Sequence, residues 1–165
     1  MQRCSVCGNI MLPGQNPDKC PMCGAPKSRF EPFSGIDGLA GSKTEENLKT
    51  AFAGESQANR RYLAFAQAAR AAGLEDVAAV FEAAAADETL HAHSHLAYLG
   101  MVRDSTANLG AALEGETYEK EDMYPGFQRD AEEEGFAQIA QYLRSVAGDE
   151  TRHAGNYKDA LDNLK

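Results

Sequence analysis

The stretch that decides the fold is DETLH at Asp87–His91, which recurs with one substitution as DETRH at Asp149–His153. In a helix, residues three positions apart lie on one face, so each copy places a Glu carboxylate beside a His imidazole. Both groups are metal ligands. The duplicated stretch therefore predicts a site for two metal ions.

The repeat extends backwards along the chain. Glu55 precedes Glu88 by almost the same distance in sequence as Glu116 precedes Glu150, and Glu55 and Glu116 each directly follow a glycine. The offset between the two copies is thus nearly constant from end to end. One helix-pair unit is present twice, and each unit contributes a Glu from its first helix and a Glu-x-x-His from its second.

Length and composition fit about one domain with a small appendage, since 43% of the 165 residues are hydrophobic. The net charge of -9 is concentrated in residues 41–165, where twelve basic residues stand against twenty-two acidic ones. An acidic surface disfavours nucleic acid and anionic membranes. No apolar run approaches the roughly 20 residues that a bilayer requires, and the first residues do not resemble a signal peptide. We therefore expect a cytoplasmic protein that binds neither nucleic acid nor membrane.

The chain divides by composition. All four cysteines lie between Cys4 and Cys23, in a stretch rich in Gly and Pro, whereas the segment from Thr44 to the end of the chain contains a single proline, Pro125. Three glycines and a proline in residues 31–41 indicate a linker. We predict a small metal-knuckle domain over residues 1–36 and a helical domain over residues 37–165.

Helical periodicity beyond the linker predicts a mainly α fold, a bundle of four helices of roughly 25 residues each. The first begins at a cap from Ser42 or Thr44 and ends before Gly73. The others are expected over about 74–99, 107–134 and 136–161, with Pro125 kinking the third. Each helix carries ionisable groups near the middle of an apolar stripe.

The carboxylates on these stripes are Glu55, Glu88, Glu116, Glu119 and Glu150. Several unpaired carboxylates in one apolar interior would repel one another and lose hydration, which is costly unless cations compensate. One Glu from each of two helices plus Glu-x-x-His from the other two is the ligand set of di-iron and di-manganese bundles. With His91 and His153, the set predicts two iron or manganese ions, because zinc prefers fewer, tetrahedral ligands.

The repeat is imperfect at one informative position. Glu119 lies one turn after Glu116, whereas the matching residue after Glu55 is Ala58. One metal therefore has a spare carboxylate. Such a ligand lets the coordination change with oxidation state, because an oxidised, harder ion prefers oxyanions and a reduced ion accepts imidazole.

The cysteines form two knuckles, Cys4-x2-Cys7 and Cys20-x2-Cys23. Two such pairs hold one tetrahedral metal ion, which supplies much of the folding free energy of so small a domain. The spacing leaves both iron and zinc open. A cytoplasmic location disfavours disulfides.

Both sets of motifs resemble one family. CSVCG and CPMCGAPKSRF resemble the rubredoxin-type domain of rubrerythrins, and GESQANRRY, DETLH, GETYEKEDMYPGF, AEEEGF and DETRH resemble its ferritin-like domain. The resemblance covers nearly the whole chain, in the domain order of the reverse rubrerythrins. It implies a ferritin-like fold for the four-helix bundle and a rubredoxin-type fold for the N-terminal domain.

The resemblance also implies an activity, a peroxidase of oxidative stress defence in which a reduced di-iron centre converts hydrogen peroxide to water. The implied roles are bridging for Glu88 and Glu150, terminal ligation for Glu55 and Glu116, fixed ligation for His153, and exchange at one iron for Glu119 and His91. Tyr62 and Tyr124 match the family's tyrosines near the metals, although their spacing also suits core packing. A ferritin-type ferroxidase, using dioxygen at the same site, is the alternative.

The electron supply is implied by the same resemblance. The iron held by the four cysteines returns electrons taken ultimately from NAD(P)H through a separate reductase or rubredoxin. No Gly-rich dinucleotide fingerprint occurs in the chain, so NAD(P)H is expected to bind another protein. Asn9 stands where such cysteine domains usually have an aromatic residue, which keeps zinc open as the metal.

The assembly is constrained by one short connection. The second and third helices of a ferritin-like bundle run parallel, so the segment from Gly100 to about Thr106 must traverse the bundle. Seven residues reach at most about 25 Å, short of a traverse of roughly 35 Å. We predict either frayed helix ends that lengthen the connection or a homodimer whose subunits exchange helix pairs.

Overall fold

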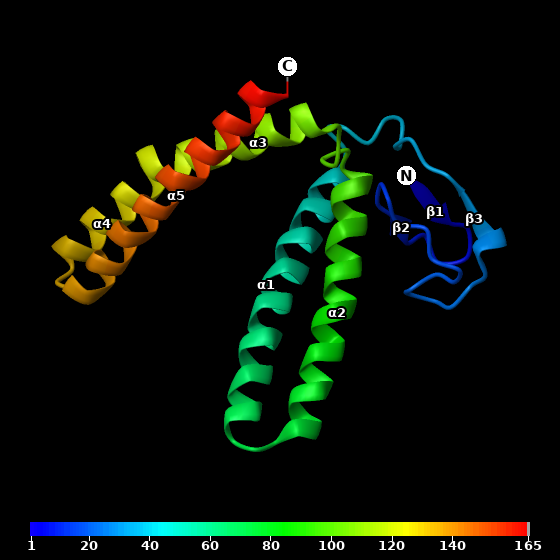
Figure 1. Ribbon diagram of the computed structural model, residues 1–165, viewed down its shortest axis with the longest axis horizontal. Helices are drawn as coiled ribbons and strands as arrows, with labels where there is room; N and C mark the ends of the chain where they lie inside the picture. Colours follow the sequence, from blue (N-terminus) through cyan, green and yellow to red (C-terminus); the bar gives the residue numbers. More distant parts are fainter. Residues whose placement is uncertain (165) are drawn as a thin grey trace. The chain divides into compact units, whose positions relative to one another are not determined.

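The protein is described by a computed structural model that covers residues 1–164. It forms two compact units, the first spanning residues 1–102 and the second beginning at Arg103. The first unit contains the cysteine knuckles and one helix pair, and the second contains the other pair (Figure 1). The predicted boundary between residues 36 and 37 is a finer division and stays a prediction.

The knuckles rest on a small antiparallel sheet of β1 (Gln2–Cys4), β2 (Ile10–Met11) and β3 (Phe30–Pro32), in the order β2-β1-β3. A 3₁₀ turn over Lys27–Arg29 precedes β3. On β1, Gln2 lies opposite Met11 of β2 and Pro32 of β3. The sheet thus ties the first knuckle, which follows β1, to both ends of the small domain.

The first helix pair is an antiparallel hairpin of α1 (Lys43–Ala71) and α2 (Glu75–Tyr98) (Figure 1). Ser42 caps α1 by accepting a 3.1 Å hydrogen bond from the Glu45 amide, which settles the predicted choice of cap. Gly73, with φ +76°, makes the turn between the helices. Small buried residues line the contact between them, among them Ala66, Ala69 and Ala78.

The second unit pairs α5 (Ala137–Asn163) with a run of α3 (Ser105–Tyr118), a π-helical turn over Glu119–Met123 (η2) and α4 (Tyr124–Glu133). Figure 1 shows this run lying antiparallel to α5. The helix is interrupted near Pro125, as expected, and the interruption is a π turn that ends at Met123. The Tyr124 amide bonds back to the Glu119 carbonyl, and Pro125 then occupies the first turn of α4, where its missing N–H costs nothing.

The helix ends bear on the predicted connection between the second and third helices. α2 continues to Tyr98 and α3 begins at Ser105, with Asp104 capping it through a 2.9 Å bond from the Ala107 amide. The helix ends are therefore not frayed, and the connection is no longer than expected. Within residues 1–164, no helix is long and apolar enough to cross a bilayer.

Candidate metal centre

The four cysteines converge on one point of the small domain. Their Sγ atoms all lie within 4.8 Å of one another, with Cys4 to Cys23 at 3.8 Å and Cys7 to Cys20 at 3.6 Å. A tetrahedral ion with metal–sulfur bonds of about 2.3 Å has sulfur–sulfur edges of about 3.8 Å. The thiols are free of disulfides and fit one iron ion.

Hydrogen bonds from backbone amides favour the thiolate form of Cys4. Burial raises the pKa of Cys4, but amide hydrogen bonds from Cys7 and Val6, together with hydrogen bonds to the Cys23 and Cys7 side chains, outweigh burial and lower that pKa to about 7. Burial instead raises the pKa of Cys7 to about 12. A bound cation is therefore needed to hold all four sulfurs as thiolates. Cys7 and Cys23 are exposed, whereas Cys4 and Cys20 are buried, so the metal would lie near the surface.

The first helix pair brings together Glu55 of α1 with Glu88 and His91 of α2, which we call the α1–α2 half-site. His91 Nδ1 lies 2.9 Å from Glu88 Oε2, one helical turn away, and 3.9 Å from Glu55 Oε2 across the pair. One ligand atom from each residue falls within 4.8 Å of the others. Two oxygens and one nitrogen thus converge within one unit.

The second pair repeats this arrangement with Glu116 of α3 and Glu150 and His153 of α5, which we call the α3–α5 half-site. His153 Nδ1 lies 2.6 Å from Glu150 Oε2 and 3.4 Å from Glu116 Oε2. Glu150 is buried, with 9% of its surface exposed. The six residues that the repeat predicted as a symmetric ligand set therefore form two clusters of three.

In both half-sites a carboxyl holds its proton more tightly than usual. A hydrogen bond with Glu88 raises the pKa of Glu55, and the same contact lowers the pKa of Glu88. Burial, followed by the contact with Glu150, raises the pKa of Glu116. A divalent cation beside two close carboxyls compensates the repulsion between their charges, so that both can ionise.

Glu116 supplies the most direct test of the fit to a metal. Its Oε2 atom is buried and has no hydrogen-bond partner among residues 1–164. An unpartnered buried carboxylate oxygen costs free energy, so such atoms are rare. A cation beside Glu116, Glu150 and His153 would satisfy it. The two clusters, each with two carboxylates and one imidazole, fit a di-iron centre.

The remaining predicted residues lie around these clusters. Glu119 opens the π turn and is outside the tight cluster, although its charge raises the pKa of Glu116. Burial and then the charges of Glu119 and Glu150 raise the pKa of Tyr124, which therefore keeps its phenolic proton. Tyr62 packs against aromatic rings, with Phe81 at 6.2 Å between centroids.

One residue beside the α1–α2 half-site was missed from the sequence. Asn59, one turn after Glu55, is buried and donates to the Ala85 carbonyl at 2.6 Å and to Thr89 Oγ1 at 2.9 Å. It fixes the two helices beside Glu88. The signal was present, because Asn is a poor residue for a helix interior unless its amide has a partner.

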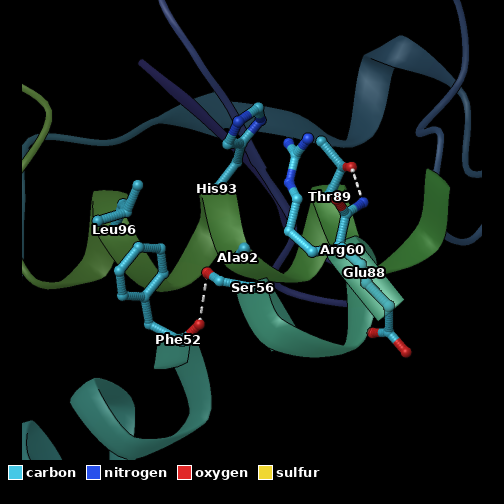
Figure 2. A pocket seen from close by; sticks show the side chains of 9 residues that line it. Phe52, Ser56, Arg60, Glu88, Thr89, Ala92, His93 and Leu96 are labelled. Carbon is cyan, nitrogen blue, oxygen red and sulfur yellow. Dashed lines mark hydrogen bonds between the residues drawn. The ribbon is translucent and has the colours of Figure 1, made fainter. Parts of the chain in front are cut away.

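The outer side of this pair carries a pocket of about 180 Å³ next to Asn59. Figure 2 shows Phe52, His93 and Leu96 around it, while the Glu88 carboxylate points away from Phe52 and Leu96. The ligand carboxylate is therefore turned away from the apolar end of this pocket. Glu55 and His91 line a different cavity of the same unit.

Comparison with known proteins agrees with the ligand clusters. A family model described as rubrerythrin matches residues 46–161, which are most of the chain. The chain belongs to the rubrerythrin family. A second model, the rubredoxin-like domain of rubrerythrin, matches residues 2–31 and places that domain at the N-terminal side.

Individual relatives extend this result. Rubrerythrin of Porphyromonas gingivalis is 41% identical over 140 residues, which cover 77% of this chain and 70% of the relative. Reverse rubrerythrin-1 of Clostridium acetobutylicum is 28% identical over 174 residues and covers 97% of this chain and 96% of the relative. A solved structure of partially reduced nigerythrin is 36% identical, covers 76% of this chain and 71% of that chain, and gives a TM-score of 0.39.

Family membership confirms the predicted fold class, mainly α and ferritin-like with a small N-terminal rubredoxin-type domain. It also makes the chain an oxidoreductase of a generally peroxide-reducing, di-iron family that works with redox partners. The predicted metals agree with the donor sets, one iron for the cysteines and two for the carboxylate and imidazole ligands.

Proposed function

We propose that the protein is a non-haem di-iron peroxidase that reduces hydrogen peroxide to water. The observation that carries this proposal is the presence of two Glu-Glu-His clusters and a four-cysteine metal site in one chain. The paired iron ions would take up peroxide and supply two electrons to its O–O bond. The cysteine-bound iron would restore those electrons one at a time.

The ligand residues have distinct tasks in this proposal. Glu88 and Glu150 would each hold both metal ions, and Glu55, Glu116 and His153 would each hold one. The raised pKa values of Glu55 and Glu116 mean that metal competes with protons for these carboxyls. Each half-site offers three ligands, and the proposed centre combines one half-site of each kind.

Four residues are proposed as catalytic. Glu119 and His91 would be alternative ligands of one iron, since an oxidised ion prefers carboxylate and a reduced ion accepts imidazole. The π turn at Glu119 supplies a locally widened backbone at that residue. Tyr124 and Tyr62 offer phenolic protons to oxygen atoms near the metals. Tyr124 is suited to donate, because burial and neighbouring carboxylates keep its hydroxyl protonated.

Electrons come from outside the chain, ultimately from NAD(P)H through a separate reductase or a rubredoxin-like donor. Cys7 and Cys23 are exposed, which would give a redox partner access to the cysteine-bound iron. A reducing cytoplasm suits this site, since free thiolates must be maintained there.

The proposal includes a homodimer with exchanged helix pairs. The segment between Tyr98 and Ser105 reaches at most about 25 Å, whereas α2 is about 36 Å long at 1.5 Å per residue. With intact helix ends, exchange between subunits is the arrangement that places parallel helices in one bundle without a longer connection. Analytical ultracentrifugation of the metal-loaded protein is expected to give a dimer; a monomer that binds two metal ions in its helices would contradict exchange.

Stopped-flow mixing of the fully reduced protein with peroxide, under exclusion of air, tests the activity. We expect rapid oxidation of both iron centres and repeated turnover when a reductant is supplied. Slow oxidation, with dioxygen preferred over peroxide, would instead favour the ferroxidase.

A further inference from the structure

The small domain is attached to α2 at a fixed place. Ser94 of α2 accepts a 3.1 Å hydrogen bond from the Ile10 amide and donates to Asn9 Oδ1 at 3.2 Å. One turn later, the Tyr98 hydroxyl donates to the Gly8 carbonyl at 2.7 Å. The segment that follows Cys7 is thus bonded to two successive turns of α2.

Apolar packing surrounds these bonds. Ile10, Phe33 and Ala97 form one buried cluster, and the rings of Phe33 and Tyr98 meet edge to face at 5.2 Å between centroids. Asn9 and Ser94 are themselves buried, at 2% and 6% exposed. Buried polar groups with mutual partners specify one arrangement, because any shift leaves them unpaired.

This attachment gives Asn9 a role. An aromatic residue at that position could not accept the hydrogen bond from Ser94, whereas the Asn9 amide accepts that bond and also donates to Met11 Sδ at 3.5 Å. Asn9 therefore serves the contact with α2. Its departure from the usual pattern is therefore no longer a reason to keep zinc open.

The attachment sets the knuckle beside the α1–α2 half-site. Ser94 and Tyr98 follow His91 by three and seven residues, or about 4.5 and 10.5 Å along the helix axis. A cavity of about 370 Å³ separates the two sites. Its wall includes Cys7 and Gly8 of the knuckle, Glu55 and His91 of the half-site, and His95.

We propose that each knuckle delivers electrons to the half-site of its own α1–α2 pair, and that Ser94 and Tyr98 are the positioning residues that fix this route. The inference rests on the proposed function, in which the cysteine-bound iron restores the di-iron centre. A cysteine ligand and an imidazole ligand that line one cavity leave a short gap, and electron transfer slows steeply with distance. The recipient iron is the one for which His91 and Glu119 are alternative ligands.

The electron balance is simple. Each transfer oxidises one ferrous thiolate-bound iron to ferric and reduces one ferric iron of the carboxylate centre to ferrous. Two transfers replace the two electrons that, together with two protons, convert one hydrogen peroxide into two water molecules. The external reductase then returns each thiolate-bound iron to ferrous.

Photochemical injection of an electron into the fully oxidised protein tests the positioning residues without peroxide. The ferrous knuckle forms first, and its decay reports transfer to the carboxylate centre. In a Ser94→Ala, Tyr98→Phe variant we expect this decay to slow by roughly tenfold or more, because the knuckle is held less closely. Thr50→Ala is the control, since the exposed Thr50 hydroxyl donates to the Glu46 carbonyl of its own helix.

The other steps separate transfer from folding and from the proposed activity. Initial reduction of the knuckle, its visible spectrum and the oxidation of the carboxylate centre by peroxide are expected to stay unchanged in the variant. An unchanged transfer rate, with or without a lower melting temperature, would overturn the positioning roles. Rapid transfer in a wild-type protein that does not react with peroxide would leave the inference standing and remove the peroxidase.

Mixed dimers test whether the route lies within one chain. One copy carries Cys20→Ser and Cys23→Ser and keeps its α1–α2 half-site. The other copy carries Glu55→Ala and His91→Ala and keeps its knuckle. In the mixed dimer the intact α1–α2 half-site and the intact knuckle therefore lie on different copies. We expect no rapid transfer in the mixed dimer. Transfer at the wild-type rate there would assign the knuckle to the partner's site and overturn the inference.

Discussion

The two half-sites share a ligand set and differ in everything around it. The α1–α2 half-site has Asn59 bridging its helices and the cysteine knuckle attached beside it. The α3–α5 half-site has instead a π turn, the additional carboxylate of Glu119, and Tyr124. The two half-sites therefore share their proposed metal ligands and differ in the residues that surround those ligands.

This difference suits each unit to a separate task. In the first, hydrogen bonds at Asn9, Ser94 and Tyr98 hold the knuckle, the proposed electron donor, against α2. In the second, a widened turn begins at Glu119, the residue proposed to exchange with His91. A fixed electron donor in one unit and an additional carboxylate in the other would together support repeated redox cycles.

The largest effect is expected where the half-sites are alike. Replacing Glu88 or Glu150 with Ala removes a proposed bridging ligand and leaves the facing carboxylate and imidazole without it. Both variants should lose the di-metal centre, and peroxidase activity should fall by roughly 100-fold or more. Metal analysis and turnover measure this, with Glu114→Gln on the exposed face of α3 as control. Full iron content and activity in either variant would show that the halves are not equivalent.

The next largest effect is expected at Glu119, which has no counterpart in the α1–α2 half-site. Glu119→Ala should retain both metal ions yet slow turnover by about 10- to 100-fold, because one iron loses its alternative ligand. Glu121→Ala is the matched control in the same π turn, since Glu121 is exposed and pairs with Lys120. Equal rates for the Glu119 variant and the wild type would remove the role proposed for Glu119.

The pH dependence of the metal-free protein separates the halves further. The pKa of Glu116 is raised in the folded protein. Protonation of Glu116 therefore contributes stability that is fully present below its pKa in the unfolded chain and is lost as pH rises through its pKa in the folded protein. Glu116→Gln should therefore stabilise the metal-free protein near neutral pH and not at low pH. Each 1 kcal/mol corresponds to about 2–4 °C in Tm. A gain in Tm of equal size at both pH values would contradict the raised pKa of Glu116.

The same proton competes with metal. Affinity for Mn²⁺ should rise with pH as Glu116 and Glu55 lose their protons, and titration with Mn²⁺ at several pH values measures this. In the first half, the lowered pKa of Glu88 offsets part of the effect. An affinity independent of pH would place the bound metal elsewhere.

The smallest effect concerns the tyrosines. Tyr124→Phe removes a protonated hydroxyl near Glu119 and should lower turnover by about two- to tenfold, the value of one hydrogen bond. Tyr62→Phe should have less effect, because the ring keeps its contact with Phe81. Steady-state rates with peroxide compare the two, and a larger loss at Tyr62 would reverse the order of the halves.

The sequence was informative where periodicity governs structure. The spacing of Glu88 and His91 predicts one helical face, and the structure brings them to 2.9 Å. The π turn was not predictable, because Pro125 also explained an interruption of the helix. The contact between the knuckle and α2 was also hidden. It depends on hydrogen bonds between residues far apart in sequence, Ser94 and Asn9, and neither spacing nor composition records such pairs.

Metal content tests the central claim, that clustered carboxylates and imidazoles in both helix pairs exist to hold a pair of metal ions. The measurement compares iron per chain in the wild type with that in a variant in which the six residues of both half-sites are Ala. The account predicts a difference of two ions per chain and an unchanged ion at the cysteines. Equal iron content in two equally folded proteins would contradict it.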